Sequence, residues 1–557
     1  MIKKIPYGQS NFADMIERGY AYVDKTRYIE LLENENNGYQ FFIRPRRFGK
    51  SLFLSILENY YDINKKEAFE SLFGEFYIGK NPTPEQGKYA VLRFDFSVLD
   101  TESHDSFRKS FSEAVQERVI SFFEEYKNIF PNAERAMEKG LGINALGTAF
   151  TAAQSAGIPI FVIIDEYDNF ANDLIAMGKD YKDEVQAGGL VRTFYKSLKA
   201  ATSSVIRRIF ITGISPMMIN DLTSGFNIAT DYSLFPKYNE MFGLTKEEVE
   251  LLIQKMGVDK SLVKIDMESY YNGYMFHEDG KTRVYNPQMI LYLFNQILQL
   301  SKQPKEVVDT NLKTDYARLR LLAENENNRE LLIQITKNGG IYGNIIEKFS
   351  LDNLNTEEYF VSFLFYLGML TNGGVQRGRI WLKIPNYSIR TLYWGYAVSY
   401  VQELEKTRIS TFELDDVTGK MAFDGELKPY LDFFTENFLK RLSNRDLIRF
   451  DEKHLKVMLL ASLFTSRLYL PNSESEVTEG YTDIYLQKHP AVADIKYEYV
   501  FEIKYAKTGV PDSEIKARRE EAQAQIERYK KDPRFANRND ILFAAIVFKG
   551  KGEYELS

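Results

Sequence analysis

Residues 158–164, an almost uninterrupted apolar run, limit the fold of this chain most strongly. Such a run is typical of a strand that is buried on both faces of a parallel sheet. Asp165 and Glu166 follow it at once. Carboxylates at the C-terminal end of a central strand lie where open α/β sheets bind their ligands. Residues 90–97 and 208–216 predict further strands, so we expect an α/β fold with a doubly wound parallel sheet.

A second segment has the order of elements that a phosphate-binding loop requires. Residues 40–43 predict a short buried strand, and residues 52–61 repeat apolar side chains at helical spacing. Between them stands the sequence Arg-Pro-Arg-Arg-Phe-Gly-Lys-Ser. Backbone N–H groups at the start of a helix hold phosphate oxygens. We therefore expect five residues to bind a nucleoside triphosphate: Arg47, Phe48, Gly49, Lys50 and Ser51.

The two segments together predict a site for ATP and Mg²⁺. Lys50 would reach the terminal phosphates, and the Ser51 hydroxyl would ligate Mg²⁺. Asp165 would hold Mg²⁺ through water, and Glu166 would polarise the attacking water. Taken separately, a chance Gly-Lys-Ser tripeptide at a helix start and a solvated acidic turn after a buried strand are the alternative explanations of these residues. Their pairing favours the nucleotide site.

Two details of this site remain open at the level of sequence. Thr212 or Ser215, at the end of the third strand, could contact the terminal phosphate or the attacking water, but an ordinary strand end explains them as well. Arg44 stands where a P-loop usually has its leading glycine. Its side chain could crowd the turn or place a guanidinium near the phosphates.

Composition narrows the remaining classes of function. With 557 residues the chain is too long for one core, so we expect two to four domains. The absence of Cys excludes disulfides and thiolate zinc sites, and favours a hard cation held by carboxylates. No apolar run approaches the roughly 20 residues of a membrane-spanning helix, and no secretory signal is visible, so we expect a cytoplasmic protein. The net charge of -7 confines any nucleic-acid binding to local basic surface.

The C-terminal part of the sequence carries a second group of candidate catalytic residues. Residues 479–486 predict a strand bearing Asp483, and residues 497–505 alternate so that Glu502 and Lys504 share one face. Asp483 and Glu502 would bind Mg²⁺, and Lys504 would position a water or stabilise charge, as in a metal-dependent nuclease. Glu452, on a preceding helix, is a candidate further metal ligand. An exposed strand face with a cross-paired ion pair is the alternative.

The middle of the chain predicts modules of a more structural kind. A helix opens at Thr245 with a capping-box pattern, and turns follow at residues 272–273 and 286–287. Residues 357–367 predict a helix, and strands after it predict a winged-helix-like module. Such modules bind DNA or transmit the nucleotide state within the protein. The net negative charge of the chain favours the second role.

These motifs together resemble the bacterial AAA-ATPase-like family, whose members commonly carry a C-terminal PD-(D/E)XK nuclease-like domain. The resemblance rests on residues 22–26 (Tyr-Val-Asp-Lys-Thr), the octapeptide 44–51, residues 165–168 and residues 212–215. Asp483, Glu502 and Lys504 match the nuclease arrangement, with Thr482 in place of its Pro and Gln525 as an auxiliary residue. It implies that Arg44 is the family's own variant of the P-loop.

The resemblance also implies an architecture. It places a P-loop AAA-ATPase-like domain at residues 1–240, a helical lid and winged-helix-like region at 241–400, and a restriction-endonuclease-like α/β domain at 401–557.

Three functions follow from this sequence. The leading hypothesis is an ATPase coupled to a metal-dependent DNA nuclease. The alternative is a nucleotide-driven regulatory switch whose nuclease fold survives only as a binding or oligomerisation module. The third is a DNA motor, a homo-oligomer with Arg207 or Arg208 as an arginine finger. DNA would bind through the C-terminal domain, where basic residues cluster: Lys504, Lys507, Lys516, Arg518, Arg519, Arg528, Lys530, Lys531, Arg534 and Arg538.

Overall fold

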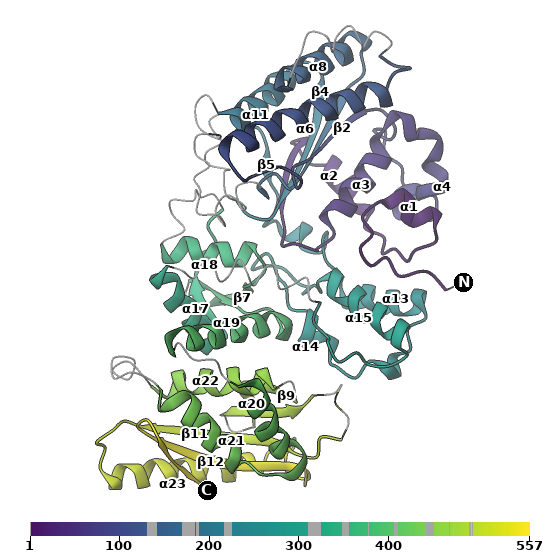
Figure 1. Ribbon diagram of the computed structural model, residues 1–557. Coiled ribbons are helices and arrows are strands. Elements are labelled where there is room, and N and C mark those ends of the chain that lie inside the picture. The colour runs from purple at the N-terminus through teal and green to yellow at the C-terminus, as the bar shows by residue number, and fades with distance from the viewer. Residues whose placement is uncertain are drawn as a thin grey trace.

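The computed structural model describes residues 2–130, 142–169, 184, 189–216, 226–309, 325–347, 356–376, 378–405, 410–441, 451–466, 468–478, 480–489, 492 and 494–557. Three parts follow one another along the chain (Figure 1). The N-terminal sheet and its helices lie at the top, a mainly helical region lies in the middle, and a second sheet lies at the bottom.

The N-terminal part is built on a parallel five-stranded sheet. Its strands are β1 (Tyr39–Ile43), β2 (Ala90–Asp95), β3 (Ile160–Asp165), β4 (Ile206–Gly213) and β5 (Thr230–Asp231), in the order β2-β3-β4-β1-β5. Every pairing is parallel, and all six residues of β3 are buried. The doubly wound α/β sheet expected from the sequence is confirmed. Since the strands are parallel, the carboxyl ends of β1, β4 and β3 meet at one edge.

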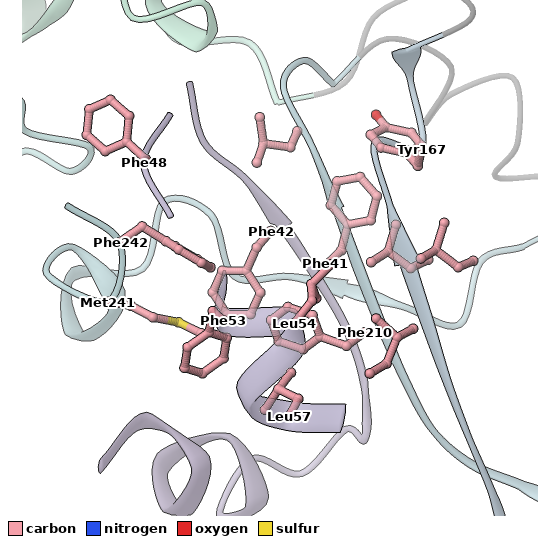
Figure 2. Close-up of a cluster of buried hydrophobic side chains, with 14 of the residues drawn as sticks. Phe41, Phe42, Phe48, Phe53, Leu54, Leu57, Tyr167, Phe210, Met241 and Phe242 are labelled. Atoms are coloured by element: carbon pink, nitrogen blue, oxygen red, sulfur yellow. The ribbon is translucent and has the colours of Figure 1, made fainter. Parts of the chain in front are cut away.

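Helices cover both faces of this sheet. They are α1 (Phe12–Glu17), α2 (Arg27–Glu33), α3 (Lys50–Tyr61), α4 (Phe69–Phe73), α5 (Tyr77–Lys80), α6 (His104–Glu125), α8 (Ala145–Ala156) and α11 (Leu190–Ala201). Aromatic packing fixes α3 against the sheet (Figure 2). The ring of Phe42 stacks on that of Phe210 at 5.1 Å, and Phe53 meets Phe242 edge to face at 5.7 Å. Burial of these rings holds the start of α3, and the loop before it, in place.

The middle region begins with the lid helices α13 (Lys246–Met256), α14 (Met267–Tyr271) and α15 (Pro287–Leu300). The capping box expected at Thr245 is present. The Thr245 side chain accepts from the Glu248 N–H at 3.3 Å, and Glu248 accepts from the Thr245 N–H at 2.8 Å. Asn286 caps α15 in a similar way, with Pro287 at the first helical position.

A winged-helix-like module follows the lid. Its elements are α17 (Glu326–Asn338), β6 (Gly340–Gly343), α18 (Glu357–Tyr366), β7 (Thr371–Gln376) and β8 (Arg379–Lys383), and the antiparallel sheet has the order β6-β8-β7. The predicted helix is α18, and two strands follow it as expected. Residues 372–374, where a turn between these strands was expected, lie inside β7 instead. The sequence did not indicate β6, which has only four residues and a glycine at each end. The long helix α19 (Tyr387–Glu405) leads on to the C-terminal part.

The C-terminal part is a mixed α/β unit. Its helices are α20 (Thr411–Gly419), α21 (Lys428–Phe434), α22 (Glu452–Thr465) and α23 (Asp512–Tyr529). Its strands are β9 (Tyr469–Val477), β10 (Gly480–Lys488), β11 (Glu498–Ala506), β12 (Ile541–Lys549) and β13 (Glu553–Leu556), in the order β13-β12-β11-β10-β9. Among the described strands of this sheet, only β11 and β12 pair in parallel. The predicted strand with Asp483 is β10, and Glu479, with which it was expected to begin, lies outside the described residues.

Across these described ranges, no helix is both long and apolar enough to cross a membrane.

Candidate functional site

The loop between β1 and α3 has the backbone of a phosphate-binding loop. Arg47 and Gly49 both adopt the left-handed conformation, with φ of 68° and 90°. A Cβ placed on Gly49 would meet no atom within 4 Å, so the space over the loop is open. Arg46, Arg47 and Ser51 border an open pocket here, together with residues from the ends of β2 and β3. The loop therefore offers a cradle that fits phosphate groups.

Lys50 is the first residue of α3, and its side chain turns back into this loop. Its Nζ donates to the carbonyl oxygens of Arg44 at 3.1 Å and Pro45 at 3.2 Å. The same atom is 4.0 Å from Oε1 of Glu166, and the lysine side chain is buried. A single ammonium group thus links the P-loop backbone to the acidic end of β3.

Asp165 is oriented by groups from two neighbouring strands. Its Oδ1 accepts from the Thr212 hydroxyl at 2.7 Å and from the Glu166 N–H at 3.0 Å. Its Oδ2 is 3.9 Å from a guanidinium nitrogen of Arg93 on β2. Thr212 reaches Asp165 because β4 lies between β1 and β3. Ser215 instead donates to Asp168 at 2.7 Å and therefore supports the turn after β3.

Glu166 combines two unusual features. Its φ of 51° is strained for a residue with a side chain, and its buried Oε2 has no hydrogen-bond partner within the described part of the chain. Burial raises the pKa of its carboxyl group, and the nearby Lys50 ammonium opposes that shift. A strained, incompletely satisfied carboxylate at the mouth of the pocket is the arrangement expected of a group that accepts a hydrogen bond from a ligand or water.

Arg44 does not line the open pocket. Its buried guanidinium donates to the carbonyl oxygens of Ile43 at 2.8 Å, Ser233 at 2.6 Å and Tyr238 at 3.0 Å. It also lies 4.1 Å from the ring centroid of Phe276 in the lid. The arginine that replaces the glycine thus fastens the end of β1 to the segment after β5. Its charged guanidinium binds carbonyl oxygens inside the core.

Phe48 is also turned toward the lid. Its ring packs edge to face on Tyr274 at 4.8 Å and on Phe276 at 5.6 Å, and it is buried. Only the backbone of Phe48 is therefore left to contact a phosphate group in the loop.

A narrow apolar pocket beside Gly49 was not predicted from the sequence. It lies between the segment before β1, the start of α3 and the lid, and its lining includes Tyr22, Val23, Gly49, Phe53, Met241, Leu244, Pro287 and Leu291. An apolar slot next to a phosphate cradle fits a flat nucleobase. The motif at residues 22–26 was the available signal, but its partners in the lid lie more than two hundred residues away in sequence.

The same motif contributes a buried ion pair. Lys25 Nζ lies 2.7 Å from the Glu248 carboxylate and donates to the Glu240 carbonyl oxygen at 2.8 Å. Asp24 accepts from the Tyr77 N–H at 2.7 Å. The Lys25 contacts join the N-terminal segment to Glu240 and to lid helix α13 beside the apolar pocket, and the Asp24 contact joins it to α5.

In the C-terminal sheet, Asp483 and Glu502 lie on neighbouring strands and each is held by protein donors. Oδ1 of Asp483 accepts from Lys456 Nζ at 2.5 Å, and Oδ2 accepts from the Ile503 N–H at 2.7 Å. Glu502 lies 3.1 Å from Lys504 Nζ and accepts from the Tyr529 hydroxyl at 2.8 Å. Burial and the Asp483 charge raise the pKa of Glu502. Asp483, Glu502 and Lys504 are thus brought together as the sequence predicts.

The fit of a metal ion to this second site is incomplete. Nowhere in the described ranges do three His, Cys, Asp or Glu side chains lie close enough to hold a metal ion. Glu452 is 3.8 Å from Lys456 and does not complete such a group. Lys456 and Lys504 place two ammonium groups against the two central carboxylates. In this structure the charges of the two carboxylates are balanced by those of the two lysines. The sequence motif did not indicate Lys456.

The two arginines considered as fingers lie near the start of β4, away from its carboxyl end. Arg207 is exposed, whereas Arg208 lies 5.5 Å from the ring of Tyr61. Their own chain's phosphate loop lies at the opposite edge of the sheet.

Family models match two parts of this chain. Residues 6–223 match the family model described as Predicted AAA-ATPase, and residues 450–554 match the one described as PD-(D/E)XK nuclease superfamily. A protein of Azotobacter chroococcum mcd 1, "Uncharacterized protein in vnfD 5'region", is 26% identical over 449 residues, which cover 78% of this chain and 77% of that protein.

Two solved structures are more distant. Cdc6p from Pyrobaculum aerophilum is 12% identical with a TM-score of 0.26, and covers 70% of this chain and 93% of its own. The Aeropyrum pernix ORC2 protein is 10% identical with a TM-score of 0.29, and covers 67% and 93%.

The burial of Arg44 gives a stability prediction. Arg44→Ala leaves three carbonyl oxygens without their charged donor, and we expect the free energy of unfolding to fall by about 3 kcal/mol or more. Arg46→Ala, at the edge of the open pocket, is the matched control and should change it by about 0.5 kcal/mol or less. Denaturant melts of both variants measure this. Equal stability of the two would contradict the structural role of Arg44.

Proposed function

We propose that this chain, an AAA-ATPase-like protein with a C-terminal PD-(D/E)XK nuclease-like domain, binds and hydrolyses ATP and transmits its nucleotide state to that domain. One observation carries the proposal. The carboxyl ends of β1, β3 and β4 bring Lys50, Asp165 and Glu166 together beside an open phosphate cradle.

Each residue has a role that follows from its position. Lys50, now bonded to two loop carbonyls, would turn its ammonium group to the terminal phosphates. Ser51 and Asp165 would hold Mg²⁺, which when bound would offset charge on the phosphates. Glu166 would accept a hydrogen bond from the attacking water, and Thr212 would keep the Asp165 carboxylate in place. The apolar pocket beside Gly49 would take the base.

The P-loop contacts the modules that would receive the signal. A Cβ on Gly368, just after α18, would come within 2.8 Å of the Pro45 ring, so loop and winged-helix-like module are in direct contact. The lid is fastened to the same module, since the Met275 N–H donates to the Thr371 hydroxyl at 2.7 Å. A shift of the P-loop therefore displaces the winged-helix-like module.

The domain boundaries are also part of the proposal. Apart from Leu470, one continuous cluster of buried side chains runs from Phe12 to Tyr396, and a second runs from Trp394 to Phe548. This supports a boundary near residue 400. The ATPase-like domain (1–240) and the middle region (241–400) share a core, which favours their moving as one body, whereas residues 401–557 form a second unit.

The ATPase proposal predicts a separation of binding from turnover. Lys50→Ala should abolish ATP binding. Glu166→Gln should keep binding but slow hydrolysis by about 100-fold or more, because the amide cannot accept a proton from water. Titration with a fluorescent ATP analogue and phosphate release measure the two steps. If Glu166→Gln hydrolyses ATP at the wild-type rate, Glu166 is not the activating residue.

For the C-terminal domain we propose a metal-dependent DNA nuclease whose metal site is held closed by Lys456. The ion pair between Lys456 and Asp483 also favours a second candidate, a nuclease-like module that serves only as a binding partner in a nucleotide-driven switch. The two differ in whether the carboxylates of Asp483 and Glu502 ever bind a divalent cation.

The lysine-closed site predicts that removing Lys456 exposes the metal ligands. In the absence of nucleotide, Lys456→Ala should bind Mn²⁺ about three- to tenfold more tightly than wild type, since a competing ion pair of about 1 kcal/mol is lost. Calorimetric titration measures this. The control is Lys453→Ala, because Lys453 is an exposed lysine on the same helix. Asp483→Ala should bind no Mn²⁺ at the C-terminal carboxylates. Equal Mn²⁺ affinity in the two lysine variants favours the non-catalytic module.

A further inference from the structure

A polar pocket of about 400 Å³ lies where the lid, the winged-helix-like module and the C-terminal domain meet. Ser269 of α14 borders it on the lid side, and Asn472 of β9 borders it on the C-terminal side. The rest of its wall comes from the end of α17, from β8 and from the start of α19. This volume is within the range of small-ligand sites. None of the roles proposed above uses it.

Three basic residues face this pocket: Lys337, Lys383 and Arg390. Lys383 is partly buried, and burial together with repulsion from Arg283 and Arg390 lowers its pKa. Within the described ranges its ammonium group has no ion pair or hydrogen bond. A half-buried cation without a carboxylate, beside two other cations, is costly unless an anion binds there.

Lys337 connects the pocket to the C-terminal domain. Its Nζ is 4.0 Å from Oδ1 of Asp451, and this long contact is its only ion pair within the described ranges. Asp451 is the N-cap of α22 and accepts from the His454 N–H at 2.9 Å. The same helix carries Lys456, which contacts Asp483. An anion that draws Lys337 away from Asp451 therefore acts on the helix beside the nuclease-like carboxylates.

Aromatic rings and a helix start complete the pocket. Trp381 of β8 lines it and packs on Tyr342 of β6 with ring centroids 4.7 Å apart. Asn386 accepts from the Ile389 N–H at 3.1 Å and so caps α19, whose first turn opens on the pocket. The positive end of this helix adds to the field of the three cations.

We propose that this pocket binds the phosphate group of a nucleotide, with its base against Trp381. The phosphate lies among Lys337, Lys383 and Arg390. Its source is either a free nucleoside monophosphate or the terminal nucleotide of a DNA strand, which share this chemistry. The proposal stands on the pocket itself and does not require ATP hydrolysis at the P-loop.

The two tryptophans of the chain make the pocket measurable. Trp394 is buried, so Trp381 is the tryptophan that a ligand in the pocket would contact. The full chain carrying Lys50→Ala is titrated with AMP, with a 5′-phosphorylated single-stranded DNA pentamer and with adenosine, while tryptophan fluorescence is recorded. We expect saturable quenching by AMP or by the pentamer, and none by adenosine at the same concentrations. Binding of AMP identifies a free nucleotide, and binding of the pentamer alone identifies a strand end.

Two further variants in the same background locate the site. Lys383→Ala should weaken binding at least tenfold, and Lys383→Gln should do the same if the alanine variant unfolds. Lys302→Ala, an exposed lysine outside the pocket, should leave the affinity unchanged. The proposal is overturned if no phosphate probe gives saturable quenching, if adenosine binds as well as AMP, or if the Lys383 variants bind like Lys302→Ala. None of these outcomes depends on whether the P-loop hydrolyses ATP.

Discussion

Strand β4 pairs in parallel with β1 on one side and with β3 on the other, so the carboxyl ends of all three strands meet at one edge. This pairing places the Thr212 hydroxyl 2.7 Å from Asp165, and it places the loop after β1 opposite the turn after β3. Lys50 and Glu166 can then approach to 4.0 Å although they are far apart in the sequence. A one-residue slip of β4 would turn Thr212 to the other face of the sheet and remove the donor that orients Asp165.

Around this edge, buried charges connect the modules to one another. Arg44 ties the end of β1 to the segment after β5 and to a lid aromatic, and Lys25 ties the N-terminal segment to the lid. Farther along, Lys337 reaches toward the N-cap of α22, and Lys456 on that helix contacts Asp483. Single residues thus lie at each junction between the phosphate loop and the C-terminal carboxylates, which is the physical basis for proposing that one site influences the other.

Local patterns were sufficient to predict much of this architecture. The apolar run at residues 158–164 predicted β3, and the strand-loop-helix order predicted the P-loop, because burial and helix starts depend on neighbours in sequence. The position of β4 between β1 and β3, the inward direction of Arg44, the apolar pocket and the contact between Lys456 and Asp483 depend on distant segments. Glu452 is a further example, because the sequence predicted its position on a helix but not its contact with Lys456.

The most direct test of the coupling between the two sites is plasmid nicking by the purified chain in Mg²⁺, with and without ATP. The account predicts nicking that requires ATP, that disappears in Lys50→Ala and that disappears in Asp483→Ala. Loss in both variants would connect the P-loop to the C-terminal carboxylates in one protein. Nicking that proceeds equally without ATP, or that persists in Asp483→Ala, would contradict the account.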